Sequence, residues 1–97
     1  MLTLPQVNED SYVAHLYVIQ CAERESLQSF LKKSGVPTDI HYPVPDYKQE
    51  SIKDRFAGLV LPNTERACEK IITLPCFPEM TDDEIREIAT VVNAWSV

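Results

Sequence analysis

Glycine is scarce in this chain, and its scarcity limits the kinds of site that the sequence can build. Only 2 of the 97 residues are glycine, whereas 7 are proline. Phosphate-binding loops and tight catalytic turns depend on glycine, because its backbone adopts conformations that other residues avoid. Neither glycine belongs to a glycine-rich run. We therefore expect no phosphate loop, and we predict that the chain is not by itself a complete catalytic unit.

Basic residues are also few. The chain has 9 Lys and Arg against 15 Asp and Glu, which gives a formal net charge of -6. Proteins that bind DNA or RNA carry basic patches or stripes that neutralise the phosphates. Here Lys32 and Lys33 form the only basic pair. The charge balance therefore argues against a nucleic-acid partner.

Paired cysteines and long apolar runs are missing as well. Cys21, Cys68 and Cys76 form no CxxC motif and no cluster with histidine at metal-ligand spacing, so we expect neither a disulfide scaffold nor a metal site. No apolar run approaches the roughly 18–20 residues of a membrane span. Residues 1–10 also lack the basic and apolar regions of a signal peptide. We expect a cytoplasmic protein with no membrane partner.

The composition is that of a folded chain, with 44% hydrophobic and 25% charged residues, and we expect one domain over residues 1–97. Alternating and β-branched residues predict short strands or extended segments over Leu2–Val7, Tyr12–Cys21, Pro37–Tyr42 and Ile72–Leu74. Helical spacing of apolar residues predicts helices over Glu23–Ser34, from Pro62 onward, and from Thr81 to Trp95. This order predicts an α+β fold: a two-layer sandwich of a small, mainly antiparallel sheet of three or four strands with about three helices. Because Tyr12–Cys21 is apolar on both faces, we expect it to be central or covered on both sides.

Two of the predicted helices carry clear end signals. Gly35 follows the pair Lys32 and Lys33, which is the place of a left-handed C-terminal cap. Thr81 with Glu84 three residues on forms a capping-box pattern. The last helix should then bury one face over three turns, made of Ile85, Ile88, Ala89, Val92 and Trp95.

The two histidines lie in different settings. His15 falls inside the predicted strand Tyr12–Cys21, which favours a structural, half-buried histidine. His41 ends an extended segment, and Pro43 and Pro45 stiffen the chain that follows it into the hydrophilic loop 46–59. Such a segment presents polar groups with little ordering cost, which suits a binding edge. On spacing alone, a functional and a structural role for His41 stay equally open.

Three segments of the sequence resemble one known family. They read HLYVIQ, TDIHYPVPDYKQ and LPCFPEMTDDEIREI, and the resemblance around them covers nearly the whole chain, over residues 4–95. Their order and spacing are similar to the C-terminal portion of the DegT/DnrJ/EryC1/StrS aminotransferases, which use pyridoxal phosphate to aminate keto-sugars attached to nucleotides. The resemblance implies the small C-terminal domain of an aspartate-aminotransferase-type enzyme, whose large cofactor-binding domain is not in this sequence.

The resemblance also implies that this chain alone is inactive. In the family a lysine of the large domain, in a serine-containing motif, holds the cofactor as a Schiff base. None of the five lysines here matches that motif: Lys32, Lys33, Lys48, Lys53 and Lys70. We therefore expect no catalytic residue and no bound cofactor in the chain. A full-length enzyme would take a nucleotide-sugar and an amino-acid donor such as glutamate, as a homodimer.

The residues carried over from the family are few. His41 matches the histidine of the family's HYP motif near the mouth of the active site, which implies a hydrogen bond to a sugar hydroxyl or a phosphate. Tyr42 follows it in that motif and, with Pro43, would fix its position. Gln49 matches a family glutamine after the prolines. At Tyr47 many members have histidine, and this departure argues against an acid–base role at that position. The resemblance thus implies substrate binding by His41, Tyr42 and Gln49.

Two other functions stay open from the residues alone. The chain could be a stand-alone, non-catalytic interaction or oligomerisation module that uses an exposed apolar face. It could also be a small-molecule sensor that uses the edge around His41. The first alternative predicts that the isolated chain dimerises or binds a protein. The second predicts that nucleotide-sugars perturb His41, Tyr42 and Gln49.

Overall fold

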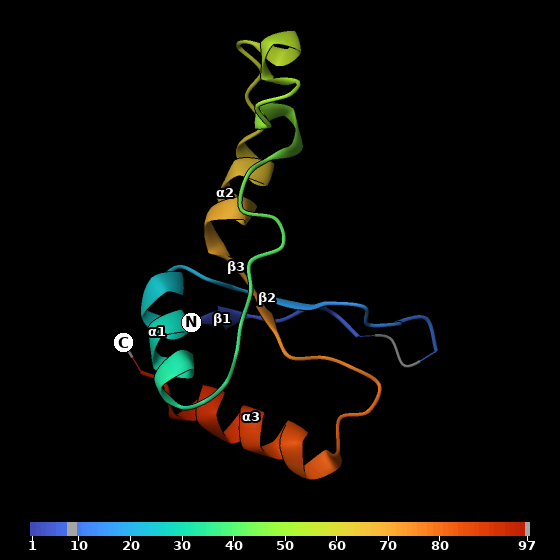
Figure 1. Cartoon of the computed structure of the whole chain (residues 1–97), viewed down its shortest axis with the longest axis vertical. Helices are drawn as coiled ribbons and strands as arrows, with labels where there is room; N and C mark the ends of the chain where they lie inside the picture. Colours follow the sequence, from blue (N-terminus) through green and yellow to red (C-terminus); the bar gives the residue numbers. More distant parts are fainter. Residues whose placement is uncertain (8–9, 97) are drawn as a thin grey trace.

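The computed structural model describes residues 1–7 and 10–96, which form three helices and one three-stranded antiparallel sheet (Figure 1). The strands are β1 (Leu2–Thr3), β2 (Tyr17–Cys21) and β3 (Ile71–Leu74). The helices are α1 (Arg24–Lys33), α2 (Pro62–Lys70) and α3 (Asp82–Ala94), with two short 3-10 helices, η1 (Asp46–Lys48) and η2 (Lys53–Phe56). The predicted α+β class is confirmed.

One face of the sheet forms the core. The strand order β1-β2-β3 makes β2 central, as its apolar sequence indicated. Ile19 of β2 pairs with Ile72 of β3, so both side chains point to the same face, and both are fully buried. Leu27 and Leu31 of α1 belong to the same buried cluster, and side chains of α3 pack against it. The sheet and the helices α1 and α3 therefore enclose one apolar layer.

The strands are shorter than predicted, because each strand needs a partner with free backbone groups. The ladder of β2 and β3 ends where Tyr17 pairs with Leu74. Pro75 comes next and has no backbone N–H with which to extend the ladder. Residues 12–16 therefore lie outside the sheet, and His15 is exposed. The interpretation of His15 as a half-buried strand residue is wrong. Extended pairing of residues 37–42 is likewise limited to a single bridge at Asp39.

The end of α1 forms the predicted left-handed cap. Gly35 has a φ of 82°, which costs little for a residue without a Cβ. Its N–H donates to the carbonyl of Lys32 at 3.1 Å, and the N–H of Val36 donates to the carbonyl of Leu31 at 2.9 Å. These two bonds make a Schellman motif. Val36 and Leu31 are both buried, so the motif also closes one end of the core.

Only the C-terminal half of α3 packs against the core. Ile88, Val91, Val92 and Trp95 contact the buried cluster, and Trp95 Nε1–H donates to Ser26 Oγ of α1 at 3.4 Å. Figure 1 shows the N-terminal end of α3 lying away from α1. Ile85 is accordingly 50% exposed, and Ala89 is exposed. The predicted buried face over three turns is therefore wrong at Ile85 and Ala89.

The N-cap of α3 provides a direct test of the capping signal. Thr81 Oγ1 accepts a hydrogen bond from the N–H of Glu84 at 3.2 Å. We expect Thr81→Ala to lower the free energy of unfolding by about 0.5–2 kcal/mol, measured by urea or thermal denaturation. Thr90→Ala is the matched control, because the Thr90 hydroxyl donates to the Arg86 carbonyl inside the same helix and alanine favours a helix interior. Equal losses in both variants would contradict the cap.

Residues 42–70 project from the sheet as an arm that contains η1, η2 and α2 (Figure 1). The molecule measures 47 × 34 × 22 Å, and its radius of gyration of 15.5 Å exceeds the roughly 12–13 Å of a compact domain of this length. The predicted loop over residues 46–59 lies in this arm and holds the two 3-10 helices. The arm starts next to the Asp39–Thr73 bridge and returns directly into β3.

Candidate functional site

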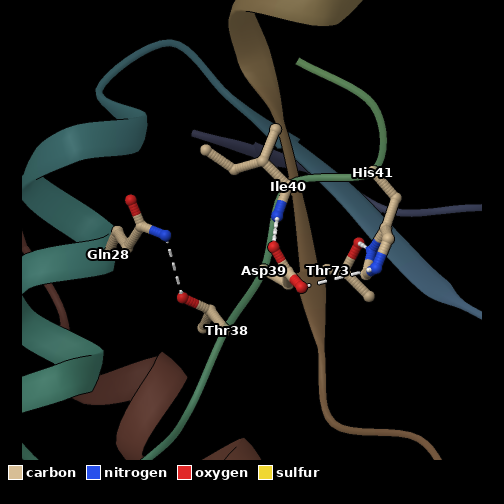
Figure 2. Close-up of polar contacts among 6 residues, drawn as sticks. All are labelled: Gln28, Thr38, Asp39, Ile40, His41 and Thr73. Carbon is tan, nitrogen blue, oxygen red and sulfur yellow. Dashed lines mark hydrogen bonds and ion pairs between the residues drawn. The ribbon is translucent and has the colours of Figure 1, made fainter.

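His41 lies at the base of the arm and is anchored to the sheet (Figure 2). Asp39 and Thr73 bridge through both backbone groups: the Thr73 N–H donates to the Asp39 carbonyl at 2.7 Å, and the Asp39 N–H donates to the Thr73 carbonyl at 3.2 Å. Two residues later His41 turns back, and its Nδ1 lies 2.8 Å from Thr73 Oγ1. Thr73 is only 6% exposed. A buried hydroxyl on a sheet strand therefore holds the imidazole.

The second ring nitrogen of His41 faces a carboxylate. Nε2 lies 3.5 Å from Asp39 Oδ2, and the side chains of His41 and Asp39 are 29% and 74% exposed. The other carboxylate oxygen of Asp39 accepts a hydrogen bond from the Ile40 N–H at 2.7 Å. The imidazole is thus fixed on its inner side and accessible on its outer side. An open pocket of about 380 Å³ lies beside this group and is lined in part by Asp39, Thr73 and His15.

The other two predicted substrate residues lie in different places. Tyr42 is 71% exposed, and its ring meets the His41 ring edge-to-face at a centroid distance of 6.0 Å. Gln49 lies in the arm, where it ends η1, and it is exposed. The structure therefore brings Tyr42 together with His41 and places Gln49 in the arm beyond them.

The arm contains a polar cluster that the sequence analysis missed, made of Tyr47, Lys48 and Glu65. The Tyr47 hydroxyl donates to Glu65 Oε1 at 2.8 Å and accepts from the Leu61 N–H at 3.2 Å. Lys48 Nζ lies 2.5 Å from Glu65 Oε1. Tyr47 is the one residue of η1 that is buried, at 7% exposure. The cluster ties η1 to α2 and so holds the two sides of the arm together.

The cluster fixes the charge states of its members. The hydrogen bond from Lys48, and then that from Tyr47, lowers the pKa of the Glu65 carboxyl. Burial and the hydrogen bond to Glu65 raise the pKa of the Tyr47 phenol. The hydrogen bond to Glu65 raises the pKa of the Lys48 ammonium. Near neutral pH the phenol therefore keeps its proton, so Tyr47 acts here as a structural hydrogen-bonding group and not as an acid or base.

Removal of the Tyr47 hydroxyl tests this cluster. We expect Tyr47→Phe to speed hydrogen exchange of the Leu61 amide by roughly five- to tenfold, because that N–H and Glu65 each lose a partner. A carboxyl group whose pKa is lowered by folding stabilises the folded state at pH values above its ordinary pKa. This stabilisation is lost as the pH falls through the lowered pKa. The ratio of exchange rates between variant and wild type should therefore shrink in acid. Tyr42→Phe, at an exposed tyrosine, is the control; equal effects in both variants would contradict the role of the cluster.

The lysines near the candidate site do not suit covalent binding of pyridoxal phosphate. Such a lysine needs a desolvated position and a lowered pKa. Lys48 instead has a raised pKa and is bound to Glu65. Lys53 is half-exposed and lies 2.9 Å from Glu50 Oε2. These two lysines therefore do not fit a covalent link to the cofactor.

The part of the chain that the structure describes holds neither a metal-ligand cluster nor a membrane-spanning helix. Within residues 1–7 and 10–96, no cluster of three or more His, Cys, Asp or Glu side chains is arranged to hold a metal ion. None of the helices in that part of the chain combines the length and the hydrophobicity needed to cross a bilayer. The three cysteines in this part of the chain are free thiols.

Comparison with known proteins gives a consistent result. A sequence profile of the DegT/DnrJ/EryC1/StrS aminotransferase family matches residues 1–93. The dTDP-3-amino-3,6-dideoxy-alpha-D-galactopyranose transaminase of Aneurinibacillus thermoaerophilus is 32% identical over 95% of this chain and 25% of its own length. The UDP-2-acetamido-2-deoxy-3-oxo-D-glucuronate aminotransferase of Pseudomonas aeruginosa is 36% identical over 91% of this chain and 24% of its own length. The chain thus spans about a quarter of the length of the curated relatives that it matches.

Solved structures of similar proteins contain the same fold. S. venezuelae DesV, solved in complex with a ketimine intermediate, superposes with a TM-score of 0.81 at 27% identity, over 95% of this chain and 26% of that chain. NtdA from Bacillus subtilis, solved with bound cofactor PMP, superposes with a TM-score of 0.77 at 32% identity, over 95% of this chain and 23% of that chain. The three helices and the three-stranded sheet are therefore found within larger aminotransferase structures.

Proposed function

Because this chain belongs to the DegT/DnrJ/EryC1/StrS aminotransferase family, we propose that it is a single domain, namely the small C-terminal domain of an enzyme that aminates a keto-sugar attached to a nucleotide. In this proposal His41 and Tyr42 bind the nucleotide-sugar at the base of the arm, and Gln49 approaches the same ligand from the arm. The names of the relatives support the substrate class, since they describe dTDP- and UDP-linked sugars.

The observation that carries the proposal is the way in which His41 is held. Its ring is fixed on the buried Thr73 hydroxyl at 2.8 Å, yet 29% of the side chain stays exposed. A side chain that serves only the core has no need to present a polar edge to solvent, whereas a ligand-binding side chain needs fixed geometry and access together. The exposed phenol of Tyr42 lies next to it. This geometry supports a binding edge.

The cofactor-dependent steps of the proposed reaction belong to the portion of the relatives' sequences that this chain does not match. We assign pyridoxal phosphate, which carries the transferred amino group when it is bound, to that portion, because Lys48 and Lys53 do not fit a covalent link to it. An amino acid such as glutamate is the proposed donor, and a homodimer in the cytoplasm is the proposed working form. By itself the chain is expected to transfer no amino group.

A domain exchange tests the proposal. The matched quarter of the Pseudomonas aeruginosa aminotransferase would be replaced by this chain, and amination of its nucleotide-sugar would be assayed with the unmodified enzyme as reference. We expect the hybrid to bind its cofactor, followed by absorbance, and to retain measurable turnover. A hybrid that is folded and loaded with cofactor but does not aminate the sugar at any substrate concentration would contradict the proposal.

A second candidate function rests on the arm. Phe56, Val60 and Leu61 are 42%, 63% and 41% exposed, and neighbouring exposed apolar side chains mark surfaces that bind other proteins. This observation favours a stand-alone interaction or oligomerisation module. Analytical ultracentrifugation of the isolated chain separates the two functions. Self-association that Val60→Asp abolishes would support the module, and a monomer at all concentrations would contradict its oligomerisation.

A further inference from the structure

Both nitrogens of the His41 ring face oxygen atoms of different chemistry. Nδ1 lies 2.8 Å from the Thr73 hydroxyl, and Nε2 lies 3.5 Å from an Asp39 carboxylate oxygen (Figure 2). A hydroxyl can donate or accept a hydrogen bond, but an ionised carboxylate can only accept. The position of the imidazole proton therefore depends on which arrangement satisfies both neighbours.

The two neutral forms of His41 are not equivalent in this setting. With the proton on Nδ1, the lone pair of Nε2 would lie near the Asp39 carboxylate, and the two acceptors would repel each other. With the proton on Nε2, the Thr73 hydroxyl donates to Nδ1 and the positive end of Nε2–H lies near the Asp39 carboxylate. In the charged ring both nitrogens carry protons, and both neighbours accept. Nε2 thus carries a proton in every favourable state.

Thr73 and Asp39 act on the ring in different ways. At 6% exposure the Thr73 hydroxyl has little access to water, and a buried hydroxyl needs a partner within the protein, so it fixes the ring whichever form the ring takes. The Asp39 carboxylate can only accept, so it selects the form with a proton on Nε2. Because the Asp39 side chain is 74% exposed, its contact with the ring is exchangeable, whereas the contact with Thr73 is shielded.

We propose that Thr73 is a positioning residue that fixes the His41 ring, that the Asp39 carboxylate keeps this ring a hydrogen-bond donor at Nε2, and that Asp39 occupies in the free chain the place of a ligand's oxygen acceptor. The ligand half of this inference rests on the proposed function; the tautomer half does not. A phosphate oxygen and a sugar hydroxyl share the required chemistry. An anionic ligand must displace the Asp39 carboxylate, because two negative charges at one Nε2–H repel each other.

The tautomer is measured directly in the free chain. Long-range ¹⁵N–¹H spectra of the full chain, read at the alkaline limit of a pH titration, should show His41 with a protonated Nε2 and an unprotonated Nδ1. We expect Asp39→Asn to weaken this preference, because an amide can donate as well as accept. Thr73→Val should free the ring and shift the Nδ1 resonance, and Thr73→Ser should keep the wild-type shift. Thr38→Val is the matched control, because the Thr38 hydroxyl accepts from Gln28 Nε2 at 3.3 Å on the same segment. A protonated Nδ1 in the wild type, an Asp39→Asn tautomer ratio identical to the wild type, or a Thr73→Val spectrum identical to the wild type would overturn the proposal.

The exchangeable contact is tested with two probes on the same sample. Inorganic phosphate offers an anionic oxygen, and methyl glucoside offers neutral hydroxyls. We expect Asp39→Asn to bind phosphate about three- to tenfold more tightly than the wild type, from removal of one nearby exposed charge. Shifts of the His41 resonances with methyl glucoside alone would assign the contact to a hydroxyl instead. If neither probe shifts His41 in the wild type or in Asp39→Asn, the ligand half is overturned while the tautomer result stands on its own.

Discussion

Replacing Leu27 with alanine is expected to lower the free energy of unfolding by about 2–5 kcal/mol. Leu27 is fully buried and belongs to the core cluster with Leu31 of the same helix and Ile72 of β3. The variant loses the transfer free energy of the removed atoms and leaves a cavity between α1 and the sheet. A small domain is stable by only about 5–15 kcal/mol, so this loss is a large part of the total. Urea denaturation followed by circular dichroism measures it.

An exposed leucine provides the control for this prediction. Leu59, in the arm, is 40% exposed and lies outside the core cluster. We expect Leu59→Ala to change the free energy of unfolding by no more than about 0.5 kcal/mol. If the two variants lose the same stability, the apolar layer between α1 and the sheet is not the main source of stability.

Replacing His41 with alanine in the hybrid enzyme is expected to raise the KM for the nucleotide-sugar by roughly 10- to 100-fold, with a smaller change in kcat. A hydrogen bond to a charged group contributes about 1.5–3 kcal/mol, and a contact made equally in the ground state and the transition state affects KM and not kcat. His41 is the side chain that combines a buried anchor at Thr73 with an exposed edge. Steady-state kinetics on the hybrid gives both constants.

An exposed residue of α3 is the control for this measurement. The Arg86 side chain is 74% exposed and does not line the pocket beside His41. We expect Arg86→Ala to leave both constants within about twofold of the parent hybrid, since exposed substitutions away from a site have small effects. A fall in kcat with an unchanged KM in His41→Ala would show that His41 acts in the chemical step, contrary to the binding role.

Features that depend on neighbours in the sequence were predictable. The cap at Gly35 and the cap at Thr81 each involve groups within five positions of one another, so the local pattern contains all the information. The apolar strand that became β2 was predicted to be central or covered on both sides, because its own residues are apolar on both faces, and it is central in the sheet. Its length was not predictable, because the ladder ends at Pro75, far along the chain.

The candidate site was predicted in part. His41 and Tyr42 were indicated by a continuous motif, and they do lie together. Thr73 was missed, although a polar residue in the apolar strand Ile71–Leu74 is a signal for a buried hydrogen bond. The contact of Tyr47 with Glu65 was also missed, because the two residues are 18 positions apart. Neither helical nor strand periodicity relates two residues so far apart in the sequence. They meet only because of the path that the arm takes.

The antiparallel pairing of β2 with β3 also governs the order in which the molecule can assemble. Tyr17 pairs with Leu74 and Gln20 pairs with Ile71, so the ladder joins segments that are roughly 50 residues apart, and closing such a loop costs entropy before any contact forms. The cap of α1 needs no such closure, whereas the sheet requires a non-local pairing of the kind that slows folding. Thr73 lies in the strand that arrives in that step. The imidazole therefore acquires its anchor only when the sheet closes, and a chain in which β3 is unpaired lacks the hydrogen bond that fixes His41.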